Sequence, residues 1–221
     1  MRRIPRGLLV VGILVLSGLV LAGCGDDDGR SVGPGLIEIE NRPTVNLTDP
    51  LLEVRYTRPG SPGTSFNATI LNDPLTSGDI LYDPVVPPYY FPEMGQNFLL
   101  FGIDRADSHR PEYRAFLDFP LDGSTGQAAI PLDAVIDNAV LRVYVSWIGF
   151  YDTIPVWLDL VEYPLTGLEP FDFDSVPLAT RSRFDIYSED FEQFVDIQVR
   201  TLMERAQLEG LADFQVRFRV Q

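Results

Sequence analysis

The stretch "FQVRFRV", residues 214–220, alternates apolar and polar side chains without a break. Successive side chains of a β-strand point to opposite faces, so Phe214, Val216, Phe218 and Val220 would share one face and two arginines the other. We therefore predict a strand that packs on a core through one face. Residues 139–147, "AVLRVYVSW", have apolar residues at every odd position, which predicts a second such strand with Trp147 completing its core face.

Other short alternating runs are separated by turn residues, and the 18 prolines and 18 glycines of the chain disfavour long helices. Further strands are expected at 51–56, 65–71, 97–103, 113–119, 156–162, 183–186 and 194–199, with loops at 59–63 and 84–92. One helix is expected at 201–208, stopped by Gly210. The pattern predicts an all-β fold, an antiparallel two-sheet β-sandwich of the jelly-roll kind, with one short helix near the C-terminus and a single domain over residues 36–221.

The first 23 residues have the layout of an export signal. Three arginines among residues 1–6 precede an uncharged run from Gly7 to Gly23. This run falls short of the about 20 apolar residues that span a bilayer, and it ends in small residues. We predict a signal peptide over residues 1–23 that is cleaved.

Leu21-Ala22-Gly23-Cys24 resembles the lipobox of bacterial lipoproteins. The resemblance implies that Cys24 becomes the first mature residue and carries a thioether-linked diacylglycerol, with a further acyl chain such as palmitate on its amine. Two or more acyl chains anchor a protein durably in a membrane. The alternative is a free cysteine in an uncleaved apolar segment. Cys24 is the only cysteine of the chain, so the domain has no internal disulfide.

Residues 24–35, with the sequence "CGDDDGRSVGPG", are rich in glycine and charge and predict a flexible tether. The triplet Asp26–Asp28 resembles acidic signals that send lipoproteins to the cell surface, or it is a solvated spacer. Cleavage removes three arginines and no acid, so the formal charge falls from −15 to −18. This charge argues against a nucleic acid partner and leaves lipid insertion as the membrane contact. We expect the outer membrane or the cell surface.

A second resemblance covers roughly residues 65–221. The segments "MGQNFLLFGIDRADSHRPEYRAFLDFPL", "IPLDAVIDNAVLRVYV" and "FVDIQVRTLMERAQLEGLADFQVRFRV" resemble DNRLRE domains, β-sandwich modules of bacterial surface and secreted proteins. The name-giving string is reduced to Asp137-Asn138-Ala139-Val140-Leu141-Arg142, and "EPFDFDSVP" replaces a tryptophan-rich middle. The resemblance implies a sandwich and polysaccharide binding, and it brings no catalytic motif.

Groups for catalysis are scarce. His109 is the sole histidine, in the polar run "DRADSHRPEY", and no Gly-x-Ser-x-Gly turn or zinc-binding pattern occurs. We therefore expect that this chain is not an enzyme. Asp172 and Asp174 in "FDFD" would share one side of a strand and, with Glu169, are candidate Ca²⁺ ligands, or they line a solvated face.

Aromatic residues give the clearest binding hypothesis, because a flat ring can stack on the apolar face of a sugar. Tyr89, Tyr90 and Phe91 lie between prolines in "PPYYFP", a predicted loop, and Trp157 would point away from the core that Leu158 and Leu160 face. The alternative is that these rings cap the end of the sandwich.

Three functions remain open at this point. The first is a non-catalytic lipoprotein, anchored to the membrane through Cys24, that binds polysaccharide or another surface component. The second is a structural or assembly lipoprotein that binds a protein partner through an exposed sheet edge. The third, which we rank last, is a glycoside hydrolase that uses two carboxylates.

Overall fold

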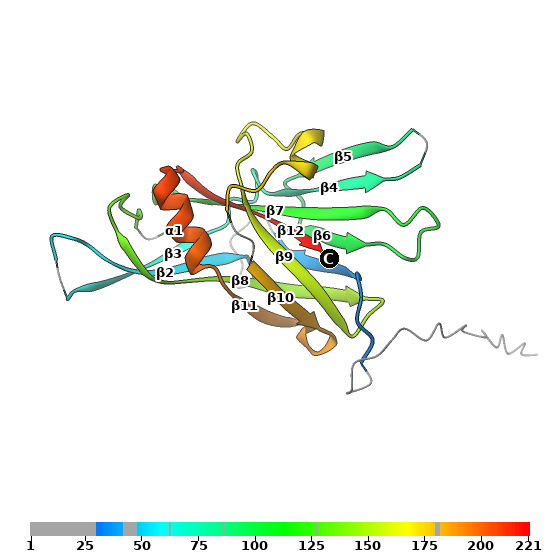
Figure 1. Cartoon of the computed structure of the whole chain (residues 1–221), viewed down its shortest axis with the longest axis horizontal. Helices are drawn as coiled ribbons and strands as arrows, with labels where there is room; N and C mark the ends of the chain where they lie inside the picture. Colours follow the sequence, from blue (N-terminus) through cyan, green and yellow to red (C-terminus); the bar gives the residue numbers. More distant parts are fainter. Residues whose placement is uncertain (1–29, 42–47, 62, 86, 127, 180–181) are drawn as a thin grey trace, which may run out of the picture.

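The computed structural model describes residues 30–41, 48–61, 63–85, 87–126, 128–179 and 182–221 (Figure 1). Its strands are β1 (Leu36–Glu40), β2 (Leu51–Thr57), β3 (Ser65–Leu71), β4 (Gly78–Asp83), β5 (Tyr89–Met94), β6 (Phe98–Ile103), β7 (Glu112–Pro120), β8 (Val135–Gly149), β9 (Thr153–Val161), β10 (Ser182–Tyr187), β11 (Gln193–Gln198) and β12 (Asp213–Val220). Its helices are the 3-10 turns η1 (Pro170–Asp174) and η2 (Ser188–Asp190) and the α-helix α1 (Arg200–Glu209). Over these described ranges, no helix has the length and apolar character needed to cross a bilayer.

The strands pair antiparallel in one sheet that curls into two facing layers (Figure 1). The first layer runs in the order β5–β4–β7–β12–β9–β10. In the second layer β1 lies between β6 and β8, and β8 also pairs with β2 and β11, while β3 pairs with β2. The layers are joined where β6 pairs with β7 over only two residue pairs. The predicted all-β antiparallel fold is confirmed.

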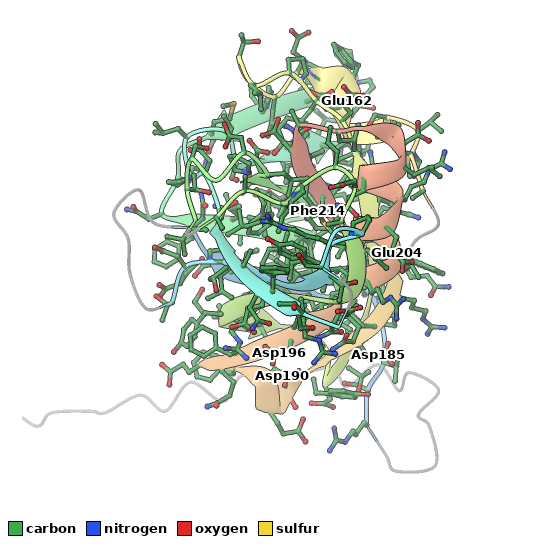
Figure 2. All side chains as sticks on the ribbon, turned by 90° about the vertical axis from the view of Figure 1, so that its left-hand side faces the viewer. Glu162, Asp185, Asp190, Asp196, Glu204 and Phe214 are labelled. Carbon is green, nitrogen blue, oxygen red and sulfur yellow. The ribbon has the colours of Figure 1, made fainter. Side chains whose placement is uncertain are left out.

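The main core lies between the layers, as the alternation of β12 predicts. Phe214, Val216 and Phe218 are fully buried, and the ring of Phe218 lies 5.0 Å from that of Phe101 on β6. Figure 2 shows Phe214 inside the molecule, whereas Glu162, Asp196 and Glu204 lie on the surface. Each large apolar side chain that is fully buried in this core contributes about 1.5–3 kcal/mol to the stability of the fold.

A second, smaller apolar cluster covers the outer face of the first layer. It is built on the segment 162–179, which crosses over β4, β7 and β12 and contains η1. Phe116 of β7 packs edge-on against Tyr163, with ring centroids 5.6 Å apart, and Phe173 of η1 is 2 % exposed. The outer face of β12 is therefore covered at Arg217, which is only 2 % exposed.

The predicted strands at 51–56, 65–71, 97–103, 113–119, 139–147, 156–162, 183–186, 194–199 and 214–220 all correspond to strands of the structure. The predicted helix is α1, and Gly210 ends it in the left-handed conformation at φ 70°. The prediction of a loop at 84–92 was wrong in its second half, because β5 begins at Tyr89. Pro92 is tolerated there because β5 is an edge strand, which pairs with β4 and with no other strand of the described ranges. Strands β1 and β4 were not predicted.

Candidate functional site

The exposed edge strand β5 carries two of the predicted stacking residues side by side. Its side chains alternate between outside and inside, so Tyr89 and Phe91 point outward and are 39 % and 48 % exposed. Their rings meet edge to face, with centroids 4.7 Å apart and an interplanar angle of 84°. We call this pair, Tyr89 and Phe91, the β5 platform. A strand holds it more rigidly than the predicted loop would.

Polar groups lie directly beside the β5 platform. The Tyr89 hydroxyl donates a hydrogen bond to Oδ2 of Asp83 over 3.1 Å, and Nδ1 of His109 lies 3.6 Å from the same oxygen. The hydrogen bond to Asp83 raises the pKa of Tyr89, so the phenol remains a protonated donor. The His109 side chain is 51 % exposed. A ring face beside a carboxylate and an imidazole matches the apolar face and hydroxyl groups of a sugar.

The other predicted stacking residues do not join this platform. Tyr90 points the opposite way along β5 and packs against Tyr82 and Phe173, with ring centroids 5.0 and 5.3 Å away. Trp157 lies half-buried on β9, opposite Arg219 of β12 and Arg183 of β10. Three strands separate β9 from β5, which places Trp157 roughly 19 Å away across the layer.

The structure corrects the expected placement of the candidate Ca²⁺ ligands. Asp172 and Asp174 belong to η1 and not to a strand. Asp172 is 1 % exposed, and its carboxylate accepts a hydrogen bond from the Glu169 backbone, whereas Asp174 forms an ion pair with Arg114 over 2.9 Å. Across the described ranges, no group of three or more histidine, cysteine or acidic residues is placed to hold a metal ion.

A second aromatic surface, which the sequence did not predict, lies at the turn between β8 and β9. Trp147, Phe150 and Phe191 are 41 %, 43 % and 46 % exposed and line a groove of about 490 Å³ together with Asp152 and Ser188. We call these three rings the hairpin cluster. The prediction that Trp147 completes a core face was wrong, because β8 contains a bulge.

The bulge is visible in the pairing of β8 with β1. Glu38 lies opposite Trp147 and Ile39 lies opposite Val145, so Ser146 is an extra residue in β8. One extra residue reverses the inside-outside alternation beyond it. Val143 and Val145 therefore face the core while Trp147 faces outward.

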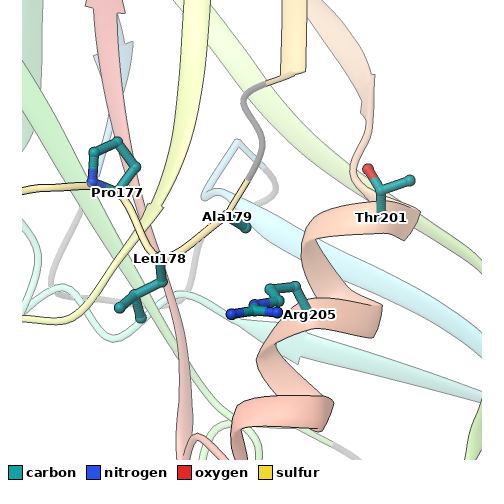
Figure 3. A pocket seen from close by; sticks show the side chains of 5 residues that line it. All are labelled: Pro177, Leu178, Ala179, Thr201 and Arg205. Carbon is teal, nitrogen blue, oxygen red and sulfur yellow. The ribbon is translucent and has the colours of Figure 1, made fainter.

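A third hollow lies between α1 and the segment that precedes β10. Figure 3 shows Arg205 of α1 extending toward Leu178, with Pro177, Ala179 and Thr201 completing a pocket of about 360 Å³. Its lining holds one cation, which pairs with Glu209, and no acid or ring. Its chemistry favours neither stacking on a sugar nor acid–base catalysis.

No protein-family model, no curated protein and no solved structure matches this chain. Only the surfaces of the chain itself therefore indicate a function. The predicted signal peptide, Cys24 and the tether as far as Gly29 lie outside the described residues.

Residues 30–35, which the sequence assigns to the tether, lie against the domain. The backbone N–H and hydroxyl of Ser31 donate to Oδ2 of Asp152 over 3.0 and 2.7 Å, and the Gly33 N–H donates to the Thr153 carbonyl over 3.1 Å. These hydrogen bonds hold residues 31–33 on the surface of the domain.

One buried acid next to β5 predicts a pH dependence of stability. Burial raises the pKa of Asp79 on β4 to about 7, although its carboxylate accepts a hydrogen bond from the Leu100 N–H over 2.9 Å. Between about pH 4 and pH 7, the Asp79 carboxyl is protonated in the folded chain and ionised in the unfolded chain. The free energy of unfolding therefore falls as the pH rises through this window, by up to about 4 kcal/mol.

Asp79→Asn keeps an acceptor for Leu100 and cannot ionise. Urea unfolding at pH 5 and pH 8 should show a smaller loss of stability with rising pH in this variant than in the native chain. Part of the loss remains, because burial also raises the pKa of Asp118 to about 6. The exposed Asp133→Asn is the matched control, and an unchanged pH dependence in Asp79→Asn would show that Asp79 is ionised in the folded chain.

Proposed function

We propose that this chain is a lipid-anchored protein of the bacterial cell envelope whose β-sandwich binds polysaccharide and performs no catalysis. The lipobox-like Leu21-Ala22-Gly23-Cys24 supports the anchor. The resemblance to DNRLRE domains supports a surface module for polysaccharide. These two features suggest that the domain meets its ligand at the outer membrane or the cell surface.

The observation that carries the binding proposal is the β5 platform. Two rings that are 39 % and 48 % exposed stand on an edge strand, and their mutual contact fixes them before any ligand arrives. Little conformational entropy is then lost on binding, which favours affinity for weak ligands such as sugars. Asp83 and His109 would hydrogen-bond hydroxyl groups at the edge of the stacked ring.

The competing proposal of a protein partner rests on the free edges of the sheet. Among the described strands, β3 pairs with β2 alone and β5 pairs with β4 alone. An extended peptide could add to either edge through backbone hydrogen bonds. Such binding would depend on backbone groups and would tolerate loss of the rings, so the experiment on the β5 platform separates the two functions.

The double variant Tyr89→Ala/Phe91→Ala is expected to bind its polysaccharide about tenfold or more weakly, because exposed rings at the centre of a contact supply most of its energy. The measurement is binding of the full chain in detergent to a glycan array, followed by titration with each polysaccharide that is bound.

The matched control is Phe194→Ala, which removes a ring that is 44 % exposed on β11 of the second layer. It should leave affinity unchanged. Equal affinity of the native chain and the Tyr89→Ala/Phe91→Ala variant for every bound polysaccharide would refute stacking at this platform. Absence of binding to any polysaccharide would favour the protein partner.

A further inference from the structure

The hairpin cluster is held outward by features of its own backbone. Phe150 has φ 80°, a left-handed conformation that is strained for a bulky residue. The indole of Trp147 covers Gly149 so closely that a Cβ there would lie 2.1 Å from Cη2 of the indole. Together with the bulge at Ser146, these features set the rings of Trp147 and Phe150 edge to face, with centroids 6.2 Å apart. Strained backbone of this kind clusters at functional sites of proteins.

The N-terminal segment leaves the domain at this same hairpin. Ser31 binds Asp152, Gly33 lies on the ring of Tyr151, and Arg30 forms a two-fold ion pair with Glu189 of η2, at 3.2 and 2.5 Å. Asp152 and Tyr151 line the groove together with the hairpin cluster. Arg30, the first described residue, therefore lies beside the groove that the exposed rings line.

The chain between this point and Cys24 is short. Arg30 is the sixth residue after Cys24, and even an extended chain covers at most about 3.5 Å per residue. An acylated Cys24 would thus hold the hairpin end of the domain within about 20 Å of the bilayer surface. The rings are then kept at a high effective concentration next to lipid headgroups.

We propose that the hairpin cluster docks into the headgroup region of the bilayer that holds the anchor, as a second contact that orients the domain. This inference depends on the proposed acylation of Cys24. Tryptophan is enriched at membrane interfaces, where its ring is partly apolar and its N–H remains hydrated. Asp152 and Glu189 beside the groove are acidic, so zwitterionic headgroups are the favoured occupant over anionic ones.

This orientation leaves the β5 platform free. β5 and β9 lie four strand steps apart in the first layer, roughly 19 Å, with β4, β7 and β12 between them. Docking at the β8–β9 turn would therefore leave β5, the outer edge strand of this layer, accessible to the surrounding polysaccharide.

The test uses tryptophan fluorescence, because the chain has two tryptophans and only Trp147 belongs to the hairpin cluster. The full-length, acylated Trp157→Phe variant is reconstituted in vesicles of phosphatidylcholine with brominated acyl chains. Emission from Trp147 should fall by about half relative to unbrominated vesicles, because bromine quenches rings that reach the interface. The matched Trp147→Phe variant, which reports on Trp157 alone, should show little quenching.

A second pair of variants guards against misfolding of Trp157→Phe. In the otherwise native chain, Phe150→Ser/Phe191→Ser should reduce the quenching, whereas Phe98→Ser, which changes a ring that is 38 % exposed on β6, should not.

The outcomes separate this inference from the proposed function. A chain that floats with the vesicles but leaves Trp147 unquenched overturns the docking and keeps the anchor. A chain that does not float overturns both. Shielding of Trp147 from aqueous acrylamide without quenching by bromine also overturns the docking, because a second copy or a glycan then covers the rings.

Discussion

Replacement of Cys24 by serine is expected to remove the lipid, so that the protein is either released to the soluble fraction or misprocessed with residues 1–23 still attached. Serine has no thiol to accept the diacylglycerol, so the anchor is not formed. Each buried methylene contributes about 0.8 kcal/mol, and two or more acyl chains bind far more tightly than any contact of the hairpin cluster. Fractionation of cells that express the full chain, with mass spectrometry of the N-terminal peptide, measures the effect.

Gly25→Ser is the matched control, because it introduces the same side chain next to an unchanged thiol. It should remain in the membrane fraction with lipid on Cys24. Recovery of the native chain as a soluble protein with residues 1–23 attached would contradict both cleavage and acylation. Retention of Cys24→Ser in the membrane with residues 1–23 removed would show that another contact holds the protein there.

The alternation in β12 predicted a buried face correctly but could not predict the fate of the opposite face. Phe214, Val216 and Phe218 form the core side because a strand has a period of two. Arg217 is covered by the segment 162–179, which is distant in sequence, whereas Arg219 reaches Asp159 of β9 and stays partly exposed. Alternation reports which residues share a face, and only tertiary contacts decide whether that face meets water.

The error at Trp147 has a different origin. A bulge is defined by two strands together, and the extra residue Ser146 becomes visible only from the register of β8 against β1. The sequence of β8 alone alternates regularly through this point. The hairpin cluster was therefore not predictable without the partner strand.

The β5 platform was predicted in part. The sequence predicted Tyr89, Tyr90 and Phe91 as candidate stacking residues in a loop, and in the structure Tyr89 and Phe91 are exposed whereas Tyr90 is half-buried. The prolines indicated a loop, but an edge strand accommodates them because it needs hydrogen bonds on one side only. That strand separates Tyr90 from its two neighbours.

Arg217→Met is expected to destabilise the domain by about 3–5 kcal/mol, the usual result of removing one partner from a buried ion pair. Nη2 of Arg217 donates to Oδ2 of Asp159 over 2.8 Å, and Asp159 is fully buried. Nη1 donates to the carbonyl oxygens of Asp172 and Phe173 over 2.9 and 2.8 Å, and Nη2 also donates to that of Ser175 over 3.0 Å. Methionine has a similar length and can make none of these bonds.

Because Arg217 also binds the carbonyl oxygens of η1, we expect Arg217→Met to loosen this segment locally in addition to lowering the stability of the whole domain. Without Arg217, η1 loses its hydrogen bonds to β12, so amide hydrogen exchange should accelerate over 162–179 more than in the main core. Chemical unfolding gives the change in the free energy of unfolding, and hydrogen exchange locates it.

Arg219→Met is the matched control, because Arg219 also reaches Asp159, over 3.1 Å, but its side chain is 18 % exposed and has no bond to η1 among the described contacts. Arg219→Met should lower the free energy of unfolding clearly less than Arg217→Met does. The double variant Arg217→Met/Asp159→Leu removes both charges and should recover only part of the loss, because the carbonyl oxygens of η1 still lack their donor. Full recovery would mean that the ion pair alone matters and that η1 is held to the sheet by the apolar contacts of Phe173.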